Sequence, residues 1–392
     1  MTIARTKGLL RDVLRAGGLL PVIRYMRRAL PQPIADVAVL PVAIVVPPAA
    51  AVVEVWEPPA PAKSDYETRI ATEIKTFADD LVVHGLPPIF HYWSNKYLLA
   101  KIEPFGFRHP DDFYTKQFAA RMTIPEFGGT YQFISIGAGN CDTEVRIAKS
   151  LLAEGHGSFS IECLELNPAM VERGRACALE QGVSQYVHPV VGDFNLWKPD
   201  KPYHAVMANQ SLHHVLNLEG LFDSISEAIR DFNGTLVTSD MIGRNGHLRW
   251  PEALDIVEEY WQRLAPRYRY DRQLRRQEDA FVNWDCSVEG FEGIRAQDIL
   301  PLLVNRFHFD MFVPFANVIS PFIDRSFGPN FEIDAVEDRA LIDEIHERDE
   351  REMLAGAIKP TQMFAVLSLD YTRPSHIVPG MQPESCVRRS VG

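Results

Sequence analysis

Residues 131–142 of this sequence read YQFISIGAGNCD. An apolar run at 131–136 leads into Gly137 and Gly139, and an amphipathic pattern follows from Asp142 onward. Glycine lets a backbone turn sharply and approach a ligand without hindrance from a Cβ atom. The free N–H groups at the start of the following helix would point at that ligand. The stretch therefore predicts a strand, a nucleotide-holding turn and a helix, although the third glycine of the usual fingerprint is missing.

From residue 131 onward, short apolar runs alternate with helical periodicity, which predicts βαβ units and a parallel sheet. The expected strands are 131–136, 159–164, 186–191, 204–208 and 234–239, with two late strands at 308–315 and 363–369. The predicted fold class is α/β, a Rossmann-like seven-stranded doubly wound sheet with an antiparallel addition. An insertion after the fifth strand would lie near the carboxyl ends of the strands, where such sheets bind ligands.

The domain organisation follows from changes in composition along the 392 residues. Residues 1–30 carry seven basic residues against Asp12, which predicts a basic amphipathic helix that contacts a membrane surface or a protein, or else a solvated arm. Residues 31–64 are rich in Pro, Ala and Val and are expected to form a linker. The remaining predicted parts are a helical substrate-side cap at 65–125, an α/β domain at 126–375 with an inserted lid at 243–305, and a flexible tail at 376–392.

Charge and cysteine content exclude several classes of protein. The net charge of −12 argues against nucleic acid as a partner, because a phosphate backbone requires a basic surface. The five cysteines form no CxxC pair, so we expect reduced thiols in a cytoplasmic protein, without disulfides and without a metal site. A small molecule is the expected partner, and the sequence does not indicate an oligomeric state.

Two further signals follow the next two strands. Glu165, at the end of the second strand, is placed to accept hydrogen bonds from both hydroxyls of a ribose, as an acid in a nicotinamide dehydrogenase also would. After the third strand comes GDFNLW (192–197), in which Asp193 can accept a hydrogen bond from an adenine amine. Phe194, beside it, can stack on the base.

With these signals in order, residues 125–370 resemble the class I S-adenosylmethionine-dependent methyltransferases. The matching motifs are SIGAGNCD (135–142), LELNP (164–168), GDFN (192–195) and HAVMANQSLHHV (204–215). The resemblance implies S-adenosyl-L-methionine as cofactor and a methyl transfer, favoured to a hydroxyl oxygen of a small-molecule or saccharide-type acceptor. The residues it implies for cofactor binding are Ser135, Gly137, Ala138, Gly139, Asp142, Glu165, Leu166, Asp193, Phe194 and Asn209.

The sequence departs from the family pattern at three positions. The family usually has an acid where this chain has Ser135 and a third glycine where it has Cys141. Asp142 is the expected source of the missing charge. Asn209 replaces a frequent aspartate at the end of the fourth strand, which argues against a metal-dependent enzyme of the catechol type.

Transfer to a hydroxyl calls for a base, and histidine is the usual choice near neutral pH. His213 and His214 follow the fourth strand, with His213 the first choice, and His247 in the lid is a further candidate. The expected substrate-binding residues are Gln210, Arg244, Arg249, Trp284, Arg295, Trp93 and Tyr97. Glu289 and Glu292 also lie among the glycines of the lid, without an assigned role.

Two other functions stay open at this stage. A nicotinamide-dependent oxidoreductase shares the glycine turn and Glu165 but leaves GDFNLW and the last strand pair unexplained. A non-catalytic binding module on a degenerate methyltransferase fold would account for Ser135 and Cys141.

Overall fold

The structure is a computed structural model that describes residues 63–77, 85–123, 129–288 and 290–388. The expected basic helix at 1–30 and most of the expected linker at 31–64 lie outside these residues. The last two residues of that linker belong instead to helix α3 (Lys63–Phe77). Within the described part of the chain, no helix combines the length and the apolar character needed to cross a membrane.

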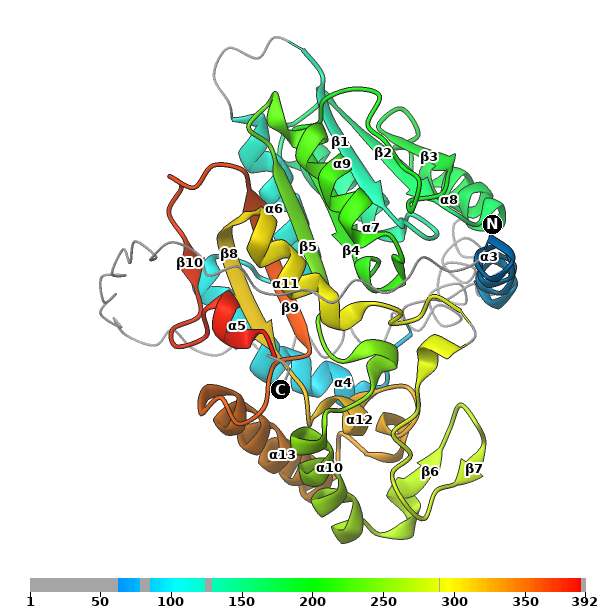
Figure 1. Cartoon of the computed structure of the whole chain (residues 1–392), viewed down its shortest axis with the longest axis vertical. Coiled ribbons are helices and arrows are strands. Elements are labelled where there is room, and N and C mark those ends of the chain that lie inside the picture. Colours follow the sequence, from blue (N-terminus) through cyan, green and yellow to red (C-terminus); the bar gives the residue numbers. More distant parts are fainter. Residues whose placement is uncertain (1–62, 78–84, 124–128, 289, 389–392) are drawn as a thin grey trace, which may run out of the picture. The chain divides into compact units, whose positions relative to one another are not determined.

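An eight-stranded sheet forms the centre of the described chain, in the order β10-β8-β9-β5-β4-β1-β2-β3 (Figure 1). The five strands from β3 to β5 in this order pair in parallel, whereas β9 is antiparallel to both β5 and β8. The bounds are β1 Tyr131–Ile136, β2 Phe159–Glu165, β3 Val187–Val191, β4 Ala205–Asn209, β5 Thr235–Met241, β8 His308–Phe315, β9 Gln362–Ser368 and β10 His376–Ile377. This order and these directions define the class I methyltransferase fold, and the α/β prediction is confirmed.

The predicted strand count of seven is too low by one. The eighth strand, β10, adds two residues in parallel to β8, and this short pairing left no apolar pattern to detect. The chain continues into helix α14 (Pro383–Cys386), whose Cys386 is buried beside Met381 and Val387. Residues 376–388 therefore belong to the fold and do not form the flexible tail that the sequence predicted.

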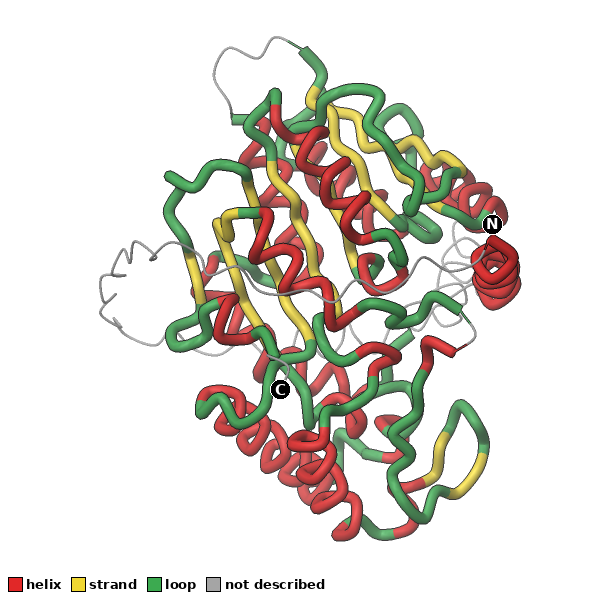
Figure 2. Tube along the Cα trace, viewed as in Figure 1, coloured by secondary structure: helices red, strands yellow, loops and turns green. Residues whose placement is uncertain are grey.

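Helices cover both faces of the sheet (Figure 2). On one face, α6 (Pro110–Met122) packs on α7 (Asp142–Ala153), which in turn contacts α8 (Pro168–Glu180). On the other face, α9 (Leu218–Arg230) packs against α11 (Ala296–Arg306). Because α11 packs on α9, residues 296–305 of the predicted lid belong to the helical layer of the core.

Local sequence explains where these helices begin. Asn167 caps α8 by accepting a hydrogen bond from the backbone N–H of Ala169, and Pro168 occupies the first helical position. At α7 the capping position belongs to Cys141, which adopts the left-handed conformation at φ 58°. Cys141 thus takes the turn conformation that a glycine usually provides.

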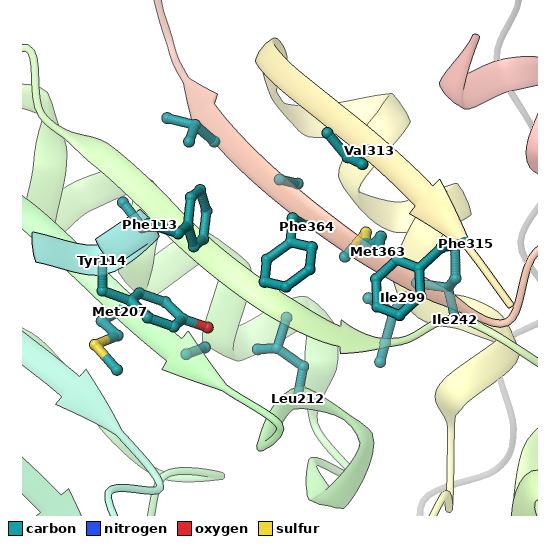
Figure 3. Close-up of a cluster of buried hydrophobic side chains, with 14 of the residues drawn as sticks. Phe113, Tyr114, Met207, Leu212, Ile242, Ile299, Val313, Phe315, Met363 and Phe364 are labelled. Carbon is teal, nitrogen blue, oxygen red and sulfur yellow. The ribbon is translucent and has the colours of Figure 1, made fainter. Parts of the chain in front are cut away.

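The buried core links α6 to the strands that lead into the functional site (Figure 3). Phe113 and Tyr114 of α6 are each 1% exposed. The Phe113 ring meets the Phe364 ring of β9 edge-on, with centroids 5.3 Å apart. Phe315 of β8 stacks on the Phe364 ring, with centroids 5.4 Å apart. Aromatic pairs at these separations stabilise a core by more than the burial of their apolar area alone contributes. The cap and the sheet therefore share one hydrophobic core.

Two insertions lie after the carboxyl ends of strands. The first, between β5 and α11, contains η4 (Asn245–His247), α10 (Pro251–Arg263), η5 (Pro266–Arg269), the hairpin β6 (Tyr270–Asp271) with β7 (Arg276–Gln277), and η6 (Cys286–Val288). The second, between β8 and β9, contains α12 (Ser320–Ile323), η7 (Gly328–Asn330) and α13 (Val336–Leu354). Ahead of the sheet, α4 (Pro88–Trp93), η1 (Ser94–Leu98), α5 (Leu99–Ile102) and η2 (Glu103–Phe105) lead into α6.

Candidate functional site

The two glycines of the turn after β1 have different roles. Both lie at positive φ, 69° for Gly137 and 57° for Gly139. A Cβ on Gly137 would lie 2.6 Å from Cβ of Ser211, so the loop after β4 leaves no room for a side chain there. A Cβ on Gly139 would meet only Cε of Met170, at 3.5 Å. Gly137 is thus required by packing, whereas Gly139 borders a space that stays open.

Glu165 closes this turn from the end of β2. One carboxylate oxygen accepts a hydrogen bond from the backbone N–H of Gly139 and the other from that of Asn167, both at 2.9 Å. The residue is 8% exposed, and burial raises the pKa of its carboxyl group. Each oxygen keeps a lone pair beyond these bonds, so Glu165 can accept hydrogen bonds from a pair of ligand hydroxyls.

Asp193 follows β3 and faces helix α3. Its Oδ1 accepts a hydrogen bond from the backbone N–H of Asn195 at 2.9 Å, and its Oδ2 accepts one from the hydroxyl of Tyr66 at 2.6 Å. Burial and the neighbouring Asp193 raise the pKa of Tyr66. The side chain of Asn167 donates to the backbone carbonyl of Ile74, also in α3, at 3.1 Å. Helix α3 therefore lies across the ends of β2 and β3, which the sequence did not predict.

Ser135 does not face this space. It is 1% exposed, and its hydroxyl donates to Oε1 of Glu144 at 2.7 Å. Glu144 is itself 2% exposed, and burial raises the pKa of its carboxyl group to about 7. The acid beside Ser135 is therefore Glu144, in the first turn of α7, and not Asp142 as the sequence suggested. Burial of the Ser135 hydroxyl speaks against the predicted cofactor contact.

Asn209, at the end of β4, is held from the cap. Its side-chain oxygen accepts a hydrogen bond from the hydroxyl of Tyr114 in α6 at 2.9 Å. The next residue, Gln210, has a positive φ of 52° and donates to the backbone carbonyl of Ser239 at 3.2 Å. Ala138 and Leu166 lie in the turns after β1 and β2, with Leu166 9% exposed. The loops after four neighbouring strands thus meet at one edge of the sheet.

Beyond β4, three imidazoles converge on the carboxylate of Glu292. Nε2 of His247 lies 2.6 Å from Oε1 of Glu292, and Nε2 of His213 lies 3.5 Å from the same oxygen. Nε2 of His214 lies 3.3 Å from Oε2 of Glu292, and its Nδ1 lies 2.8 Å from Oε1 of Glu73 in α3. All three base candidates therefore belong to a single cluster, the histidine cluster, formed by His213, His214, His247 and Glu292.

Asp240, at the end of β5, supports the cluster from below. It is fully buried and accepts hydrogen bonds from the backbone N–H groups of Ser211, Leu212 and Met241 at 2.7–2.8 Å. Its Oδ1 also lies 2.7 Å from Nδ1 of His213. Burial opposes the charge on His213, but Asp240 and Glu292 outweigh it and raise the pKa of His213 to about 10.

His247 and Glu292 respond differently to burial. For His247, burial outweighs the bond to Glu292 and lowers the pKa. For Glu292, the hydrogen bonds from His213 and His247 outweigh burial and lower the pKa of the carboxyl group. The cluster therefore combines a charged imidazole, a neutral imidazole and a carboxylate within a few ångströms.

Left-handed backbone brings His247 and Glu292 together. Gly246, His247 and Gly293 have φ values of 62°, 59° and 65°. The backbone N–H of Gly246 donates to the carbonyl of Gly293 at 2.8 Å, and that of Ile294 donates to the carbonyl of His213 at 3.1 Å. A Cβ on Gly246 would lie 1.9 Å from Oδ1 of Asp285. The positions on both sides of the cluster are thus fixed by backbone contacts.

Several predicted substrate residues lie in other networks. Arg295 is 4% exposed and forms ion pairs with Glu219 at 2.5 Å and Asp298 at 2.8 Å, so its charge is used within the fold. Trp93 and Tyr97 belong to a separate cluster with α13: Trp93 donates to Nδ1 of His346, and the Tyr97 hydroxyl donates to Asp343. These contacts speak against a substrate role for the three residues.

The other lid candidates lie nearer the histidine cluster or at the surface. Arg249 donates to the carbonyl of His247 at 3.0 Å, and burial lowers its pKa. Arg244 donates to the carbonyl of Arg249 at 3.2 Å, while Trp284 is 68% exposed. Sequence reasoning gave no role to Tyr66, Glu73, Glu144, Asp240 or Glu292. Glu144 lies 9 residues from its partner Ser135 along the chain, and Tyr66 lies 127 residues from its partner Asp193. No local sequence pattern reveals such contacts.

No protein-family model matches the sequence, and no curated protein matches it. Among solved structures, the fold is similar to geranyl diphosphate C-methyltransferase from Streptomyces coelicolor A3(2), at 13% identity and a TM-score of 0.40, over 77% of this chain and 98% of that one. It is also similar to the [4+2]-cyclase SpnF, at 16% identity and a TM-score of 0.39, over 80% and 96%. The assignment of the fold rests on strand order and direction.

Proposed function

We propose that this protein is an S-adenosylmethionine-dependent methyltransferase that acts on a small molecule. The observation that carries the proposal is the edge formed by the turn at Gly137 and Gly139, Glu165 and Asp193. These groups follow β1, β2 and β3 in order, at the carboxyl ends of parallel strands. Ligands bind at this edge in doubly wound sheets.

The side chains at this edge fit the cofactor part by part. The open turn at Gly139 would accommodate the methionine end, and Glu165 would accept hydrogen bonds from the ribose hydroxyls through its remaining lone pairs. Asp193 would accept a hydrogen bond from the adenine amine. Phe194, the next residue, is 5% exposed. The bound cofactor supplies an activated sulfonium methyl group, so the protein mainly aligns the reactants and excludes water.

For the acceptor we propose a hydroxyl group, because imidazoles directly follow β4. The acceptor oxygen forms the new bond to the methyl carbon, the S–C bond breaks with its electron pair going to sulfur, and the hydroxyl proton passes to an imidazole. His214 suits this step, since Glu73 lies behind its Nδ1 at 2.8 Å and holds the ring. Gln210 beside it is the proposed contact to the acceptor.

Five cysteines without a disulfide fit the proposed cytoplasmic location.

The test is a calorimetric titration of the full chain with S-adenosylhomocysteine. We expect micromolar binding that NAD does not displace. Glu165→Gln and Asp193→Asn should each weaken it about 10- to 100-fold, the equivalent of one lost charge-assisted hydrogen bond. Glu180→Gln, an exposed change at the end of α8, is the matched control and should bind like the wild type. Unchanged affinity in both site variants, or displacement by NAD, would overturn the proposal.

A further inference from the structure

We propose that His213, His247 and Glu292 bind a divalent transition-metal ion. One ligand atom from each of these residues lies within 4.8 Å of the others. Ligand atoms at about 2.0–2.1 Å from a tetrahedral ion are themselves about 3.4 Å apart. The 3.5 Å between His213 Nε2 and Glu292 Oε1 already matches this spacing, and the 2.6 Å contact of His247 Nε2 with the same oxygen would open by less than an ångström.

The ligand set selects the kind of ion. Mg²⁺ and Ca²⁺ prefer oxygen ligands, whereas imidazole suits zinc, iron, nickel and copper. Two imidazoles and one carboxylate with open positions form the arrangement known from non-haem iron and catalytic zinc sites. The side chain of Glu292 is 38% exposed, so the remaining coordination positions face accessible space. The site therefore fits an ion of the manganese-to-zinc series that keeps a position for a further ligand.

A first independent observation is the support behind His213. Metal-binding histidines usually donate the ring N–H that is not used for the metal to a carboxylate or carbonyl group, which fixes the ring. Nδ1 of His213 lies 2.7 Å from Oδ1 of Asp240, and this directs Nε2 toward Glu292. Asp240 is in turn held by the backbone N–H groups of Ser211 and Leu212, after β4, and of Met241, the last residue of β5. These are the outer contacts of an oriented metal ligand, and a bound ion would take the place of the Nε2 proton, which would be released to solvent.

A second independent observation is the backbone of His247. A non-glycine residue in the left-handed region costs about 1–3 kcal/mol, and such strain collects at functional sites. His247 has this conformation at φ 59°. It directly follows Gly246, whose backbone N–H donates to the carbonyl of Gly293. Asparagine and glycine adopt this conformation more easily than histidine does, so the backbone alone does not favour a histidine there. A ligand role for its imidazole accounts for the position.

The role of the ion rests on the proposed function. A divalent ion held by these three residues would bind the acceptor hydroxyl at its open coordination position. It would lower the pKa of that hydroxyl, as metal ions do for bound water. Such an ion would lie in the histidine cluster that directly follows β4, beside His214, which we propose to take the proton. The sequence gave no sign of a metal because the three ligands lie 34 and 45 residues apart, in no recognised spacing. Binding itself does not depend on methyl transfer.

The experiment measures metal binding and cofactor binding separately. The full chain is treated with chelator and dialysed, then titrated with Zn²⁺, with Co²⁺ as an absorbing reporter and with Mg²⁺ as the hard-ion control. We expect one Zn²⁺ or Co²⁺ per chain, with d–d absorption of cobalt and no comparable binding of Mg²⁺. Glu292→Gln and His247→Asn should each weaken Zn²⁺ binding by at least about tenfold. Asparagine suits the left-handed backbone, so this variant keeps the loop conformation.

His376→Ala is the matched control, because His376 is exposed in β10 and should leave metal binding unchanged. Absence of Zn²⁺ and Co²⁺ binding by the wild type, or equal affinity in both ligand variants, would overturn the metal site. Titration of the same samples with S-adenosylhomocysteine distinguishes the two proposals. Metal binding without cofactor binding would leave the metal site standing and refute the methyltransferase function, and the reverse result would do the opposite.

Discussion

Two regions of this protein place histidine near acidic residues, and they affect the pKa of the imidazole in opposite ways. In the histidine cluster, Asp240 and Glu292 raise the pKa of His213 to about 10. Between α4 and α13, His346 accepts a hydrogen bond from Nε1 of Trp93 at 3.2 Å and lies under the ring of Tyr97, with centroids 3.7 Å apart. Burial there, aided by Lys101, lowers the pKa of His346 to about 4.

The difference shows that the neighbours decide what a buried histidine does. His346 has a donor on its ring nitrogen and serves as a neutral acceptor inside a packed interface. His213 has a carboxylate near each ring nitrogen, at 2.7 Å and 3.5 Å, which suits a hydrogen-bond donor or the proposed metal ligand. The first arrangement stabilises the fold, and the second prepares a site. Substitutions that change these neighbours should therefore separate stability from binding.

The largest effect is expected for Asp240→Asn. The amide nitrogen would face backbone N–H groups that now donate to the carboxylate, which leaves buried donors without acceptors. We expect the free energy of unfolding to fall by about 2–4 kcal/mol, together with weaker Zn²⁺ binding, in urea denaturation and metal titration. Asp255→Asn, an exposed change in α10, is the control. A fully stable Asp240→Asn protein would contradict the supporting role of Asp240.

Gly246→Ala should come next. Its Cβ would lie 1.9 Å from Oδ1 of Asp285, and alanine is strained at a φ of 62°. The loop must shift, so we expect a loss of about 1–3 kcal/mol in unfolding free energy and weaker Zn²⁺ binding through displaced His247. Gly356→Ala also changes a glycine at positive φ, but with no atom within 4 Å and far from the lid in sequence. Equal metal affinity in both variants would show that His247 is not a ligand.

A smaller effect concerns pH and His346. Its folded pKa of about 4 lies below the unfolded value near 6.5, so the unfolded state binds more protons between these values. The stability from this group is therefore complete above pH 6.5 and is lost as the pH falls toward 4, by about 3 kcal/mol.

Urea denaturation at pH 7.5 and pH 4.5 checks this prediction. His346→Gln keeps an acceptor for Trp93 but removes the titration, so it should lose less stability on acidification than the wild type does. His91→Gln, an exposed change in the same helix as Trp93, should behave like the wild type. The same acid dependence in wild type and His346→Gln would mean that the region between α4 and α13 does not hold a neutral histidine.

The smallest expected effect is that of Tyr66→Phe. Removal of the hydroxyl breaks the 2.6 Å bond to Asp193 and loosens α3 over the ends of β2 and β3. One hydrogen bond is worth about 1 kcal/mol, so S-adenosylhomocysteine should bind about fivefold more weakly in calorimetry. Tyr371→Phe, an exposed tyrosine outside the site, is the control. Unaltered affinity in Tyr66→Phe would place α3 outside the binding site.

Much of the fold could be predicted from the sequence, because the strands of a buried parallel sheet are continuous apolar runs. The runs at 131–136 and 308–315 match β1 and β8 at both ends, and the other predicted strands differ from the structure by one or two residues. The two-residue β10 was missed because two residues carry no period. The antiparallel direction of β9 was expected from the added strand pair and is confirmed.

The site was less accessible to sequence reasoning. Glu165 and Asp193 follow strands directly, so strand prediction alone places them at the carboxyl edge. Glu144 and Tyr66 come from helices, and their direction depends on packing that no local pattern encodes. Arg295 and Trp93 have the chemistry of substrate contacts, but partners from distant segments engage them within the fold. Charge and aromatic character identify candidates, and tertiary partners decide among them.

We propose the carboxyl edge of β1, β2 and β3 as the S-adenosylmethionine site. The most direct measurement is a crystal structure of the full chain with S-adenosylhomocysteine. We predict that the ribose hydroxyls bind the carboxylate of Glu165, the adenine amine binds Asp193, and the sulfur faces the histidine cluster. The proposed site would be contradicted by a ligand bound elsewhere. It would also be contradicted if crystals grown with saturating ligand show only protein side chains at this edge.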